Sequence, residues 1–383
     1  MPISRHLIHK KTGIDYCYAC YAAKLRHLRK IAWSLAILIP VASAQSTANL
    51  PAYPDVFAFR SYLPEGQKPA VGGATTKKVK TPRPRMEGSF TGGYIEDAVV
   101  RTQIRVRFDA EFSVEDPDRA EFFYGKCGCY RLLAPGLSTD PNAPGPGPGI
   151  AARLNAQELH ANFEYALLPR LSFFADLPER SLQYTATVGG KMSNGSGFGD
   201  FVAGLKFALV ASERTYLTFE FAAFMPTGGA AQGLGTDHYS VQPLLLLNHR
   251  LGEHTSLLAQ FGDFHPLGGS AGYPTASSPN GFAGDVLEYG LGAGYRFDTT
   301  PETAITPLLE FVGWHVFDGY YTSATVVTPT PELSAAGVNI VNVKAGARIS
   351  FHQHHSVYLG YGEALTNSRW YKEILRVEYR YLF

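Results

Sequence analysis

The stretch ILRVEYRYLF, from Ile374 to Phe383, alternates in character along its length. From Leu375 onward the odd positions are large and apolar: Leu375, Val377, Tyr379, Tyr381 and Phe383. The positions between them are Arg376, Glu378, Arg380 and Leu382. Successive side chains of a strand point to opposite faces, so this stretch predicts a strand with one apolar face and one mainly charged face. The apolar face would meet a second sheet in a soluble sandwich, and lipid in a membrane barrel.

The same alternation recurs along most of the chain. Its clearest instance has Thr102, Ile104, Val106, Phe108, Ala110 and Phe112 on one face, and Arg101, Gln103, Arg105, Arg107, Asp109 and Glu111 on the other. A search of the chain for this alternation predicts twelve strands, at 97–113, 155–167, 170–178, 198–210, 214–226, 237–250, 254–265, 286–297, 303–317, 337–351, 354–365 and 370–383. Their lengths suit tilted strands that cross a bilayer, which need roughly nine to eleven residues each.

The connections between these strands alternate between long and short. The long ones are 114–154, 179–197, 227–236, 266–285 and 318–336. The final connection, 366–369, would lie at the same end of the strands as these. The short ones are 168–169, 211–213, 251–253, 299–302 and 352–353. This sorting is typical of outer-membrane barrels, and a Greek-key sandwich has no reason to show it. We therefore predict an all-β fold: a transmembrane antiparallel up-and-down β-barrel of about twelve strands, with short periplasmic turns and longer extracellular loops.

An even number of strands lets the last strand pair with the first. That closure is required in lipid, because an unpaired backbone group in hydrocarbon costs several kcal/mol. We expect Tyr379, Tyr381 and Phe383 to lie in a periplasmic aromatic girdle, and the Phe383 strand to be recognised by the barrel-assembly machinery. The expected location is the bacterial cell outer membrane, with lipid and lipopolysaccharide around the barrel.

The front of the chain resembles an export signal followed by a linker. A basic cluster precedes the apolar run Ile31 to Ala44, which is too short for a membrane helix and ends in Ala42-Ser43-Ala44, an A-x-A cleavage pattern. We predict a signal peptide at 1–44 with an extended n-region, a flexible periplasmic leader or plug at 45–96, and the barrel at 97–383. The first 23 residues indicate either a misplaced start or an extended export signal. Removing residues 1–44 changes the formal net charge from +1 to −5.

Few features of the chain indicate a partner outside the membrane. The strongest basic stretch, Lys77 to Arg85, lies in a Pro-containing linker, so we expect no nucleic-acid partner. Cys17 and Cys20 lie in the predicted signal peptide. Cys127 and Cys129 would be exported, and their pairing stays open between a bridge that holds a surface loop and a reactive role.

Several motifs resemble the family described as putative MetA-pathway of phenol degradation. They are Phe174-Ala175-Asp176-Leu177-Pro178, then Gly195-Ser196-Gly197-Phe198-Gly199-Asp200, then Gly204-Leu205-Lys206. The likeness runs from about residue 155 to the C-terminus, and the long leader and the Cys127/Cys129 loop depart from it. The resemblance implies a transporter-like outer-membrane barrel: a porin-like channel or transporter for small, hydrophobic or aromatic solutes.

If the apolar positions face lipid, the opposite positions line the pore. The candidate pore-lining residues are Arg101, Gln103, Arg105, Arg107, Glu158, His160, Glu164, Lys206, Glu220, Arg296, Glu310, Lys344, Arg348, Arg376 and Glu378. Their mixed charges favour ion pairs that stiffen the wall over an ion-selective ring. Lys206 and Glu220 are expected to pair across one hairpin. The inward glycines from Gly290 to Gly294 would widen the lumen or accommodate bulky neighbours.

Other interpretations of the sequence concern the aromatic and histidine residues. Aromatic loop residues, among them Phe122, Tyr130 and Tyr320, would either contact an aromatic solute or join the upper interfacial belt, to which Trp314 and Trp370 are assigned.

A phospholipase-like barrel enzyme is the main alternative function, but neither His249 nor His315 has an outward Ser beside it in sequence, so we predict no catalytic residues. A structural or adhesive barrel is the third possibility. The histidines at 352, 354 and 355 lie in a tight turn and predict no metal site. We expect a monomer without a cofactor.

Overall fold

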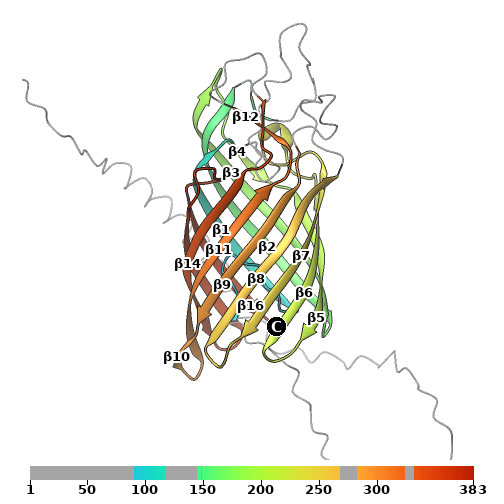
Figure 1. Ribbon diagram of the computed structural model, residues 1–383, viewed down its shortest axis with the longest axis vertical. Coiled ribbons are helices and arrows are strands. Elements are labelled where there is room, and N and C mark those ends of the chain that lie inside the picture. The colour runs from blue at the N-terminus through green and yellow to red at the C-terminus, as the bar shows by residue number, and fades with distance from the viewer. Residues whose placement is uncertain (1–89, 118–144, 148, 268–282, 324–331) are drawn as a thin grey trace, which may run out of the picture. The chain divides into compact units, whose positions relative to one another are not determined.

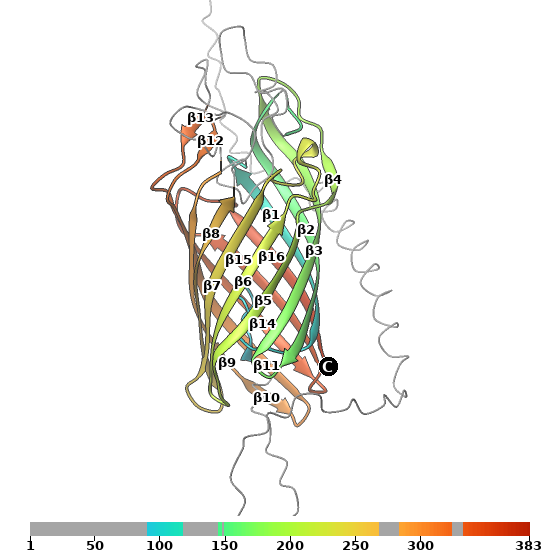
Figure 2. The ribbon, with the colours of Figure 1, turned by 90° about the vertical axis from the view of Figure 1, so that its right-hand side faces the viewer.

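Twelve long antiparallel strands form a closed ring, as the sequence predicts. In chain order they are β1 (Gln103–Glu115), β2 (Ile150–Leu168), β3 (Leu171–Val188), β5 (Phe201–Ala211), β6 (Thr215–Met225), β7 (Tyr239–Arg250), β8 (Thr255–Leu267), β9 (Val286–Tyr295), β11 (Thr303–Val316), β14 (Asn339–Phe351), β15 (His355–Ala364) and β16 (Glu373–Leu382). Each strand pairs with the next, β9 pairs with β11, and β16 pairs with β1, so the ring has no open edge. Figures 1 and 2 show the strands winding obliquely around the barrel.

This arrangement comes from a computed structural model of the chain, which describes residues 90–117, 145–147, 149–267, 283–323 and 332–383. Short elements complete the described part. β4 (Gly195–Phe198) pairs with the upper end of β3, and β10 (Phe297–Thr300) pairs with the start of β11. β12 (Tyr320–Thr322) and β13 (Glu332–Ser334) form a separate hairpin, and η4 (Ala230–Gln232) is a single 3₁₀ turn. Among the described residues, no helix has the length and apolar character needed to cross a membrane.

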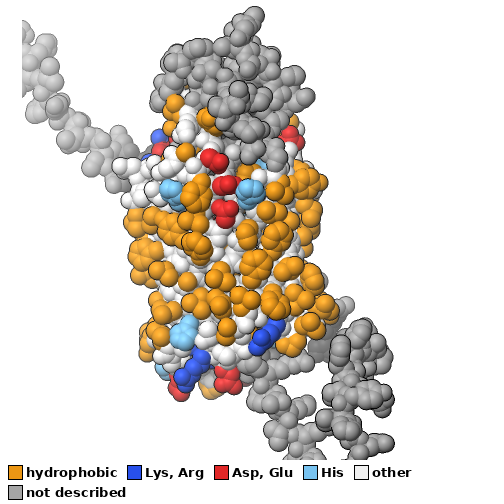
Figure 3. All heavy atoms as spheres, turned by 45° about the vertical axis from the view of Figure 1, so that its right-hand side comes forward, with side chains coloured by type: hydrophobic (Ala, Val, Ile, Leu, Met, Phe, Trp, Pro, Cys, Tyr) orange, Lys and Arg blue, Asp and Glu red, His pale blue; other side chains and the backbone are white. Residues whose placement is uncertain are grey.

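The ring closes in a register that puts the apolar positions of its two end strands on the same face. Ile104 lies opposite Tyr381, and Phe108 lies opposite Val377. Large apolar side chains are exposed around the whole outer wall, among them Ile104, Phe163, Phe173, Phe207, Phe219, Leu245, Phe261, Leu291, Phe311, Leu359 and Leu375. Figure 3 shows this apolar belt, with charged side chains gathered at its edges. A belt of this kind is compatible with hydrocarbon and not with water.

The two rims of the barrel differ as the connections predict. One rim carries the tight turns and the C-terminus (Figure 1). There residues 352–354 form a tight turn, in which His352 and Gln353 have φ values of 50° and 60°. The longer connections meet at the other rim. By the general layout of these proteins, the tight-turn rim is the periplasmic rim and the other is the extracellular rim. The fold and its apolar belt place the protein in the bacterial outer membrane.

The C-terminal residues are integrated into the periplasmic rim. The N–H of Phe383 donates a hydrogen bond to the carbonyl of Thr102 at 3.2 Å, which ties the last residue to the start of β1. The Phe383 ring lies 4.9 Å from that of Tyr381, and the Tyr379 hydroxyl lies 2.8 Å from a ring nitrogen of His355. The alternating stretch from Ile374 to Phe383 therefore ends in an aromatic cluster on the rim.

The largest differences between predicted and observed strand boundaries are at three places. The first strand begins at Gln103 and not at 97, because the chain before it leaves the wall and lies inside the barrel. β2 and β3 extend beyond their predicted ends, to Ile150 and Val188, and continue to pair past the membrane-spanning part. Of the predicted leader, only residues 90–96 are described; the predicted signal peptide and the Cys127/Cys129 loop lie outside the described residues.

Candidate functional site: the barrel interior

Residues 90–101, called here the luminal segment, enter the barrel from the periplasmic rim. Phe90 lies near that rim, where the guanidinium groups of Arg250 and Arg296 stack over its ring at 4.4 and 5.5 Å. The chain reaches the level of Glu310 on β11 at Gly93 to Ile95, and then returns toward the start of β1. Most of the segment is buried, including Phe90, Ile95 and Asp97. It therefore occupies much of the periplasmic half of the interior, and a cavity of about 830 Å³ lined by Val100, Tyr216 and Phe383 remains at the rim.

Glu310 is the anchor of this segment. Its carboxylate accepts hydrogen bonds from three successive backbone N–H groups, those of Gly93 at 3.1 Å, Tyr94 at 2.9 Å and Ile95 at 3.0 Å. Consecutive N–H groups that converge on one anion form a nest, and each bond to the charged group is stronger than a neutral one. The Glu310 side chain is fully buried.

Wall side chains also bind the carbonyl groups of the segment. Asn248 donates to the Phe90 carbonyl at 2.6 Å, and Lys206 donates to the Asp97 carbonyl at 3.0 Å. Arg348 donates to the Gly92 carbonyl at 2.6 Å, and Arg376 to the Gly93 carbonyl at 2.9 Å. The polar backbone of the segment is thus satisfied by side chains from the wall strands β5, β7, β14 and β16.

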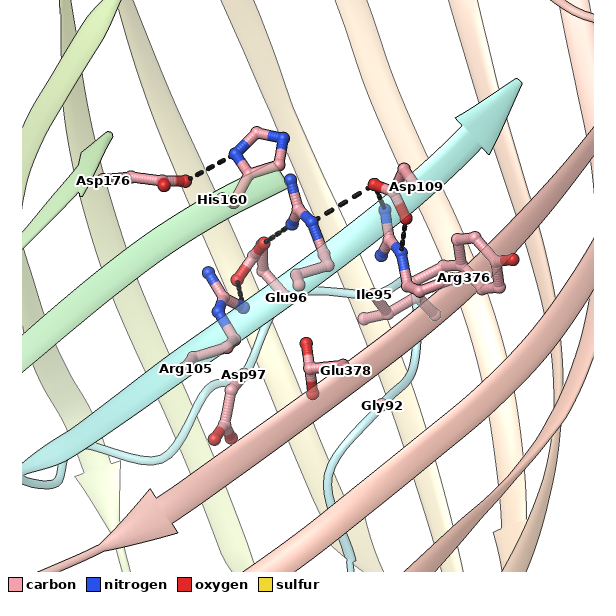
Figure 4. Close-up of polar contacts among 12 residues, drawn as sticks. Gly92, Ile95, Glu96, Asp97, Arg105, Asp109, His160, Asp176, Arg376 and Glu378 are labelled. Carbon is pink, nitrogen blue, oxygen red and sulfur yellow. Dashed lines mark hydrogen bonds and ion pairs between the residues drawn. The ribbon is translucent and has the colours of Figure 1, made fainter. Parts of the chain in front are cut away.

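Two acidic side chains of the segment face basic residues. The Glu96 carboxylate lies 3.0 Å from the Arg105 guanidinium (Figure 4). Asp97 lies 3.0 Å from Arg101 and 3.1 Å from Arg380. Burial alone would raise the pKa of Glu96 and Asp97, but the neighbouring arginines hold the pKa of each below its ordinary value. Both groups therefore stay charged at neutral pH and tie the segment to the wall.

Glycines in the wall and in the segment make this close approach possible. A Cβ atom at Gly290 would lie 3.3 Å from the Ile95 side chain, and one at Gly292 would lie 3.1 Å from it. A Cβ atom on Gly93 would overlap the Tyr358 ring, at 2.0 Å. The inward glycines of β9 thus accommodate a bulky neighbour, and that neighbour is a residue of the luminal segment.

The predicted pore-lining residues are placed as follows. All except Arg101 and Arg296 lie on strands, at interior-facing positions. Arg101 belongs to the luminal segment, and Arg296 lies in the irregular link between β9 and β10, where it pairs with Asp298 at 2.6 Å. Their role in lining a pore stays a prediction.

Most of these charges are engaged in ion pairs. Lys206 lies 3.4 Å from Glu220, as predicted, and 3.5 Å from Glu164. The remaining pairs are Arg348 with Glu378, Arg380 with Glu378, Arg376 with Asp109, Arg107 with Asp109, Arg180 with Glu158, and His160 with Glu158 and Asp176. The wall of the periplasmic half is thus a network of paired charges of both signs.

The extracellular half of the interior is the more apolar half. Its large buried apolar residues form one cluster that includes Val114, Leu154, Leu182, Phe264, Val286, Val312, Trp314, Val316, Ile340, Trp370 and Ile374. Polar side chains lie among them, since Gln242 and Gln260 donate hydrogen bonds to Glu288 at 2.7 and 2.6 Å. The assignment of Trp314 and Trp370 to the interfacial belt is wrong: they are 6% and 1% exposed, lie inside, and meet edge to face at 6.3 Å. The inward positions of a strand can also be apolar. The sequence pattern alone therefore does not distinguish an inward tryptophan from one at the membrane interface.

The sequence raised a plug within residues 45–96 as an alternative but did not locate the luminal segment, since residues 45–96 have no regular pattern and 97–102 continue the alternation of β1. The only local signal is Gly92-Gly93 followed by Tyr94, Ile95 and two acids.

Sequence reasoning also left Asp200, in the motif Gly195 to Asp200, without a role. The Asp200 carboxylate accepts hydrogen bonds from the N–H of Gly228 at 2.9 Å and the N–H of Thr236 at 2.8 Å. That motif therefore folds the connection between β6 and β7.

The outward histidines have polar neighbours that the sequence did not indicate. The His249 ring lies 2.8 Å from the Thr215 hydroxyl on the adjacent strand, yet the described residues supply no third group to orient a catalytic pair. Within the described part, Asp263, His265 and Asp285 are the only acidic and histidine residues whose ligand atoms converge within 4.8 Å, and the histidines of the 352–355 turn are not among them. The aromatic loop residues Phe122 and Tyr130 lie outside the described residues.

Solved structures similar to this fold are outer-membrane barrels. An outer membrane channel from Pseudomonas putida F1 is 18% identical, with a TM-score of 0.44 over 76% of this chain and 99% of that one. The Pseudomonas putida toluene transporter TodX is 11% identical, with a TM-score of 0.34 over 78% and 95% of the two chains. LpxR from Salmonella typhimurium is 10% identical, with a TM-score of 0.38 over 73% and 100%. No protein-family model and no curated protein sequence matches the chain, so the family resemblance stays a prediction.

Proposed function

We propose that this outer-membrane barrel is a channel for small apolar solutes, aromatic ones included, and that the luminal segment closes it in the resting state. The observation that carries the proposal is the division of the interior. On the extracellular side, an apolar cluster that contains Trp314 and Trp370 lines part of the interior, above the ion-paired half in which the luminal segment lies. A solute leaving water would be bound first by the apolar half, and it would reach the periplasm when the segment moves.

The way the segment is held supports movement. Its contacts with Glu310, Arg348, Arg376 and Lys206 are made by wall side chains. Releasing these contacts leaves the hydrogen-bond ladder between the strands intact, so the barrel keeps its closure. Apolar solutes also suit a wall whose charges are paired, because a paired wall offers no single-sign field to select ions.

Single-channel recording in planar bilayers tests this function. We expect the unaltered protein to be mostly closed, and the Gly93→Leu variant to conduct, because a side chain at Gly93 would overlap Tyr358 and displace the segment. Ala186→Leu adds bulk at an exposed position of β3 and should behave as the unaltered protein does. A folded Gly93→Leu barrel that never conducts would contradict the proposal and favour a structural or adhesive barrel.

A further inference from the structure

Several cationic side chains of the wall strands are predicted to line the lumen. Among them, Lys344 is the one that forms no ion pair or hydrogen bond with any described residue. The register of β11 and β14 places it opposite Glu310, the partner that a cross-strand pair would use. Both oxygens of Glu310 are occupied by the N–H groups of the luminal segment instead. On its other side Lys344 faces Gly362, which has no side chain. A buried ammonium group, 4% exposed, is therefore left uncommitted.

Aromatic rings surround this ammonium group. It lies 4.1 Å from the centre of the Tyr94 ring, and 5.5 Å from those of Trp314 and Tyr371. The faces of these rings attract a cation, and so hold the charge in place without a counter-ion. They leave its three N–H donors available for an acceptor. Lys344 therefore lies where the top of the luminal segment meets the apolar half of the interior.

Two further polar groups near Lys344 are incompletely satisfied. Asn342 is fully buried beside Tyr371, and its only side-chain hydrogen-bond partner in the described part of the chain is Tyr371, which leaves most of the hydrogen-bonding capacity of its amide unused. The buried hydroxyl of Tyr94 has no hydrogen-bond partner in the described part of the chain. Buried polar groups are nearly always paired, so this combination indicates a ligand that supplies an acceptor.

The surroundings define the rest of that ligand. Ile340 lies two residues from Asn342 on the same interior face of β14, and Trp314 and Trp370 meet edge to face within the same apolar cluster. Apolar walls with a few convergent polar groups are the usual composition of a small-molecule site. A molecule with a compact apolar body and one polar head would match this composition.

The charges around Lys344 decide the sign of that head. Arg376 is bound by Asp109 at 2.7 and 2.8 Å, and Glu310 is bound by the luminal segment. The remaining charged neighbours are Glu111 and Glu288, which act on Lys344 electrostatically but form no ion pair with it among the described residues. An incoming anion would thus find one available cation, and it would compete with Glu111 and Glu288 for that cation.

We propose that Lys344 and Asn342 bind the carboxylate of a small apolar monocarboxylate, whose apolar body lies against the tryptophan-lined wall above them. This site deepens the proposed channel function and rests on it. Tyr94 contributes its hydroxyl from the luminal segment, so the ligand would touch both the wall and the segment.

Calorimetric titration of the full-length protein in detergent tests the site with three probes of similar size: benzoate, benzyl alcohol and benzylamine. We expect benzoate to bind most tightly, and Lys344→Met to weaken it by at least about tenfold, as loss of a charge-assisted hydrogen bond would. Benzyl alcohol binding should change little. Glu111→Gln should tighten benzoate binding by removing one competing anion. Lys372→Met, at a lysine that is 52% exposed, is the matched control.

Three results would overturn the inference: benzylamine binding more tightly than benzoate, unchanged benzoate affinity in a folded Lys344→Met barrel, or weaker benzoate binding in Glu111→Gln. Entry of the same probes into proteoliposomes separates this inference from the proposed function. If benzoate and benzyl alcohol both enter through the barrel and Lys344→Met alters neither, the carboxylate site fails and the channel stands. If the barrel admits no probe in any variant, the channel itself fails.

Discussion

Replacing Glu310 by Gln is the sharpest perturbation of the luminal segment. The carboxylate accepts three backbone hydrogen bonds, at 2.9 to 3.1 Å, from Gly93, Tyr94 and Ile95. A hydrogen bond to a charged group contributes about 1.5–3 kcal/mol net. Gln keeps one acceptor oxygen, but it loses the charge and turns an NH₂ group toward backbone donors. We expect the inserted state to lose about 2–4 kcal/mol, which shifts the equilibrium toward release by a factor of roughly 30 to 900.

Single-channel recording measures this shift as open probability. We expect Glu310→Gln to raise the open probability at least about tenfold over the unaltered protein. Glu213→Gln makes the same chemical change at an exposed turn and should have no effect. Heat-modifiable migration in gels would show that each variant is folded. A folded Glu310→Gln barrel with unaltered open probability would refute the reasoning.

Three further predictions concern the segment and the outer wall. Because their pKa values are lowered, the carboxylates of Glu96 and Asp97 should stabilise insertion above about pH 4 and lose that effect as the pH falls further, so conductance should rise below pH 4, and this rise should be absent from a Glu96→Gln/Asp97→Asn variant; the same rise in that variant would contradict this. Gly292→Val should displace Ile95 and raise the open probability, whereas Ala293→Val on the outward face should not, and equal effects would argue against the packing of the segment. Leu291→Arg, at a side chain that is 68% exposed, should reduce the free energy of unfolding in lipid vesicles by about 2–4 kcal/mol, and a loss near zero would deny its contact with lipid.

The barrel could be predicted from sequence because lipid imposes a strict rule on every strand. The alternation in Leu375 to Phe383 and in Ile104 to Phe112 follows from a wall with lipid on one side. The alternation of long and short connections identified the two rims. The Lys206–Glu220 pair could be predicted as well, because the turn between β5 and β6 fixes the register of that hairpin.

The interior could not be predicted to the same extent, because no comparable rule governs it. The luminal segment has no repeating pattern, and its contacts with Glu310 and Arg348 join residues more than 200 positions apart. Trp314 was assigned to the interface because tryptophan is common there, but it lies on the inward face of β11. Lys344 was expected to be one wall charge among many. Only the three-dimensional structure reveals that the luminal segment occupies its cross-strand partner.

The central claim is that the luminal segment must move for solutes to pass. A disulfide between Ile95→Cys and Gly290→Cys tests it most directly, because a Cβ atom at Gly290 would lie 3.3 Å from the Ile95 side chain, within reach of a bridge once the four native cysteines are replaced by serine. We predict that the oxidised barrel stays closed in bilayer recordings and in solute uptake, and that reduction restores both. Solute uptake through the fully cross-linked barrel at the rate of its reduced form would contradict the account.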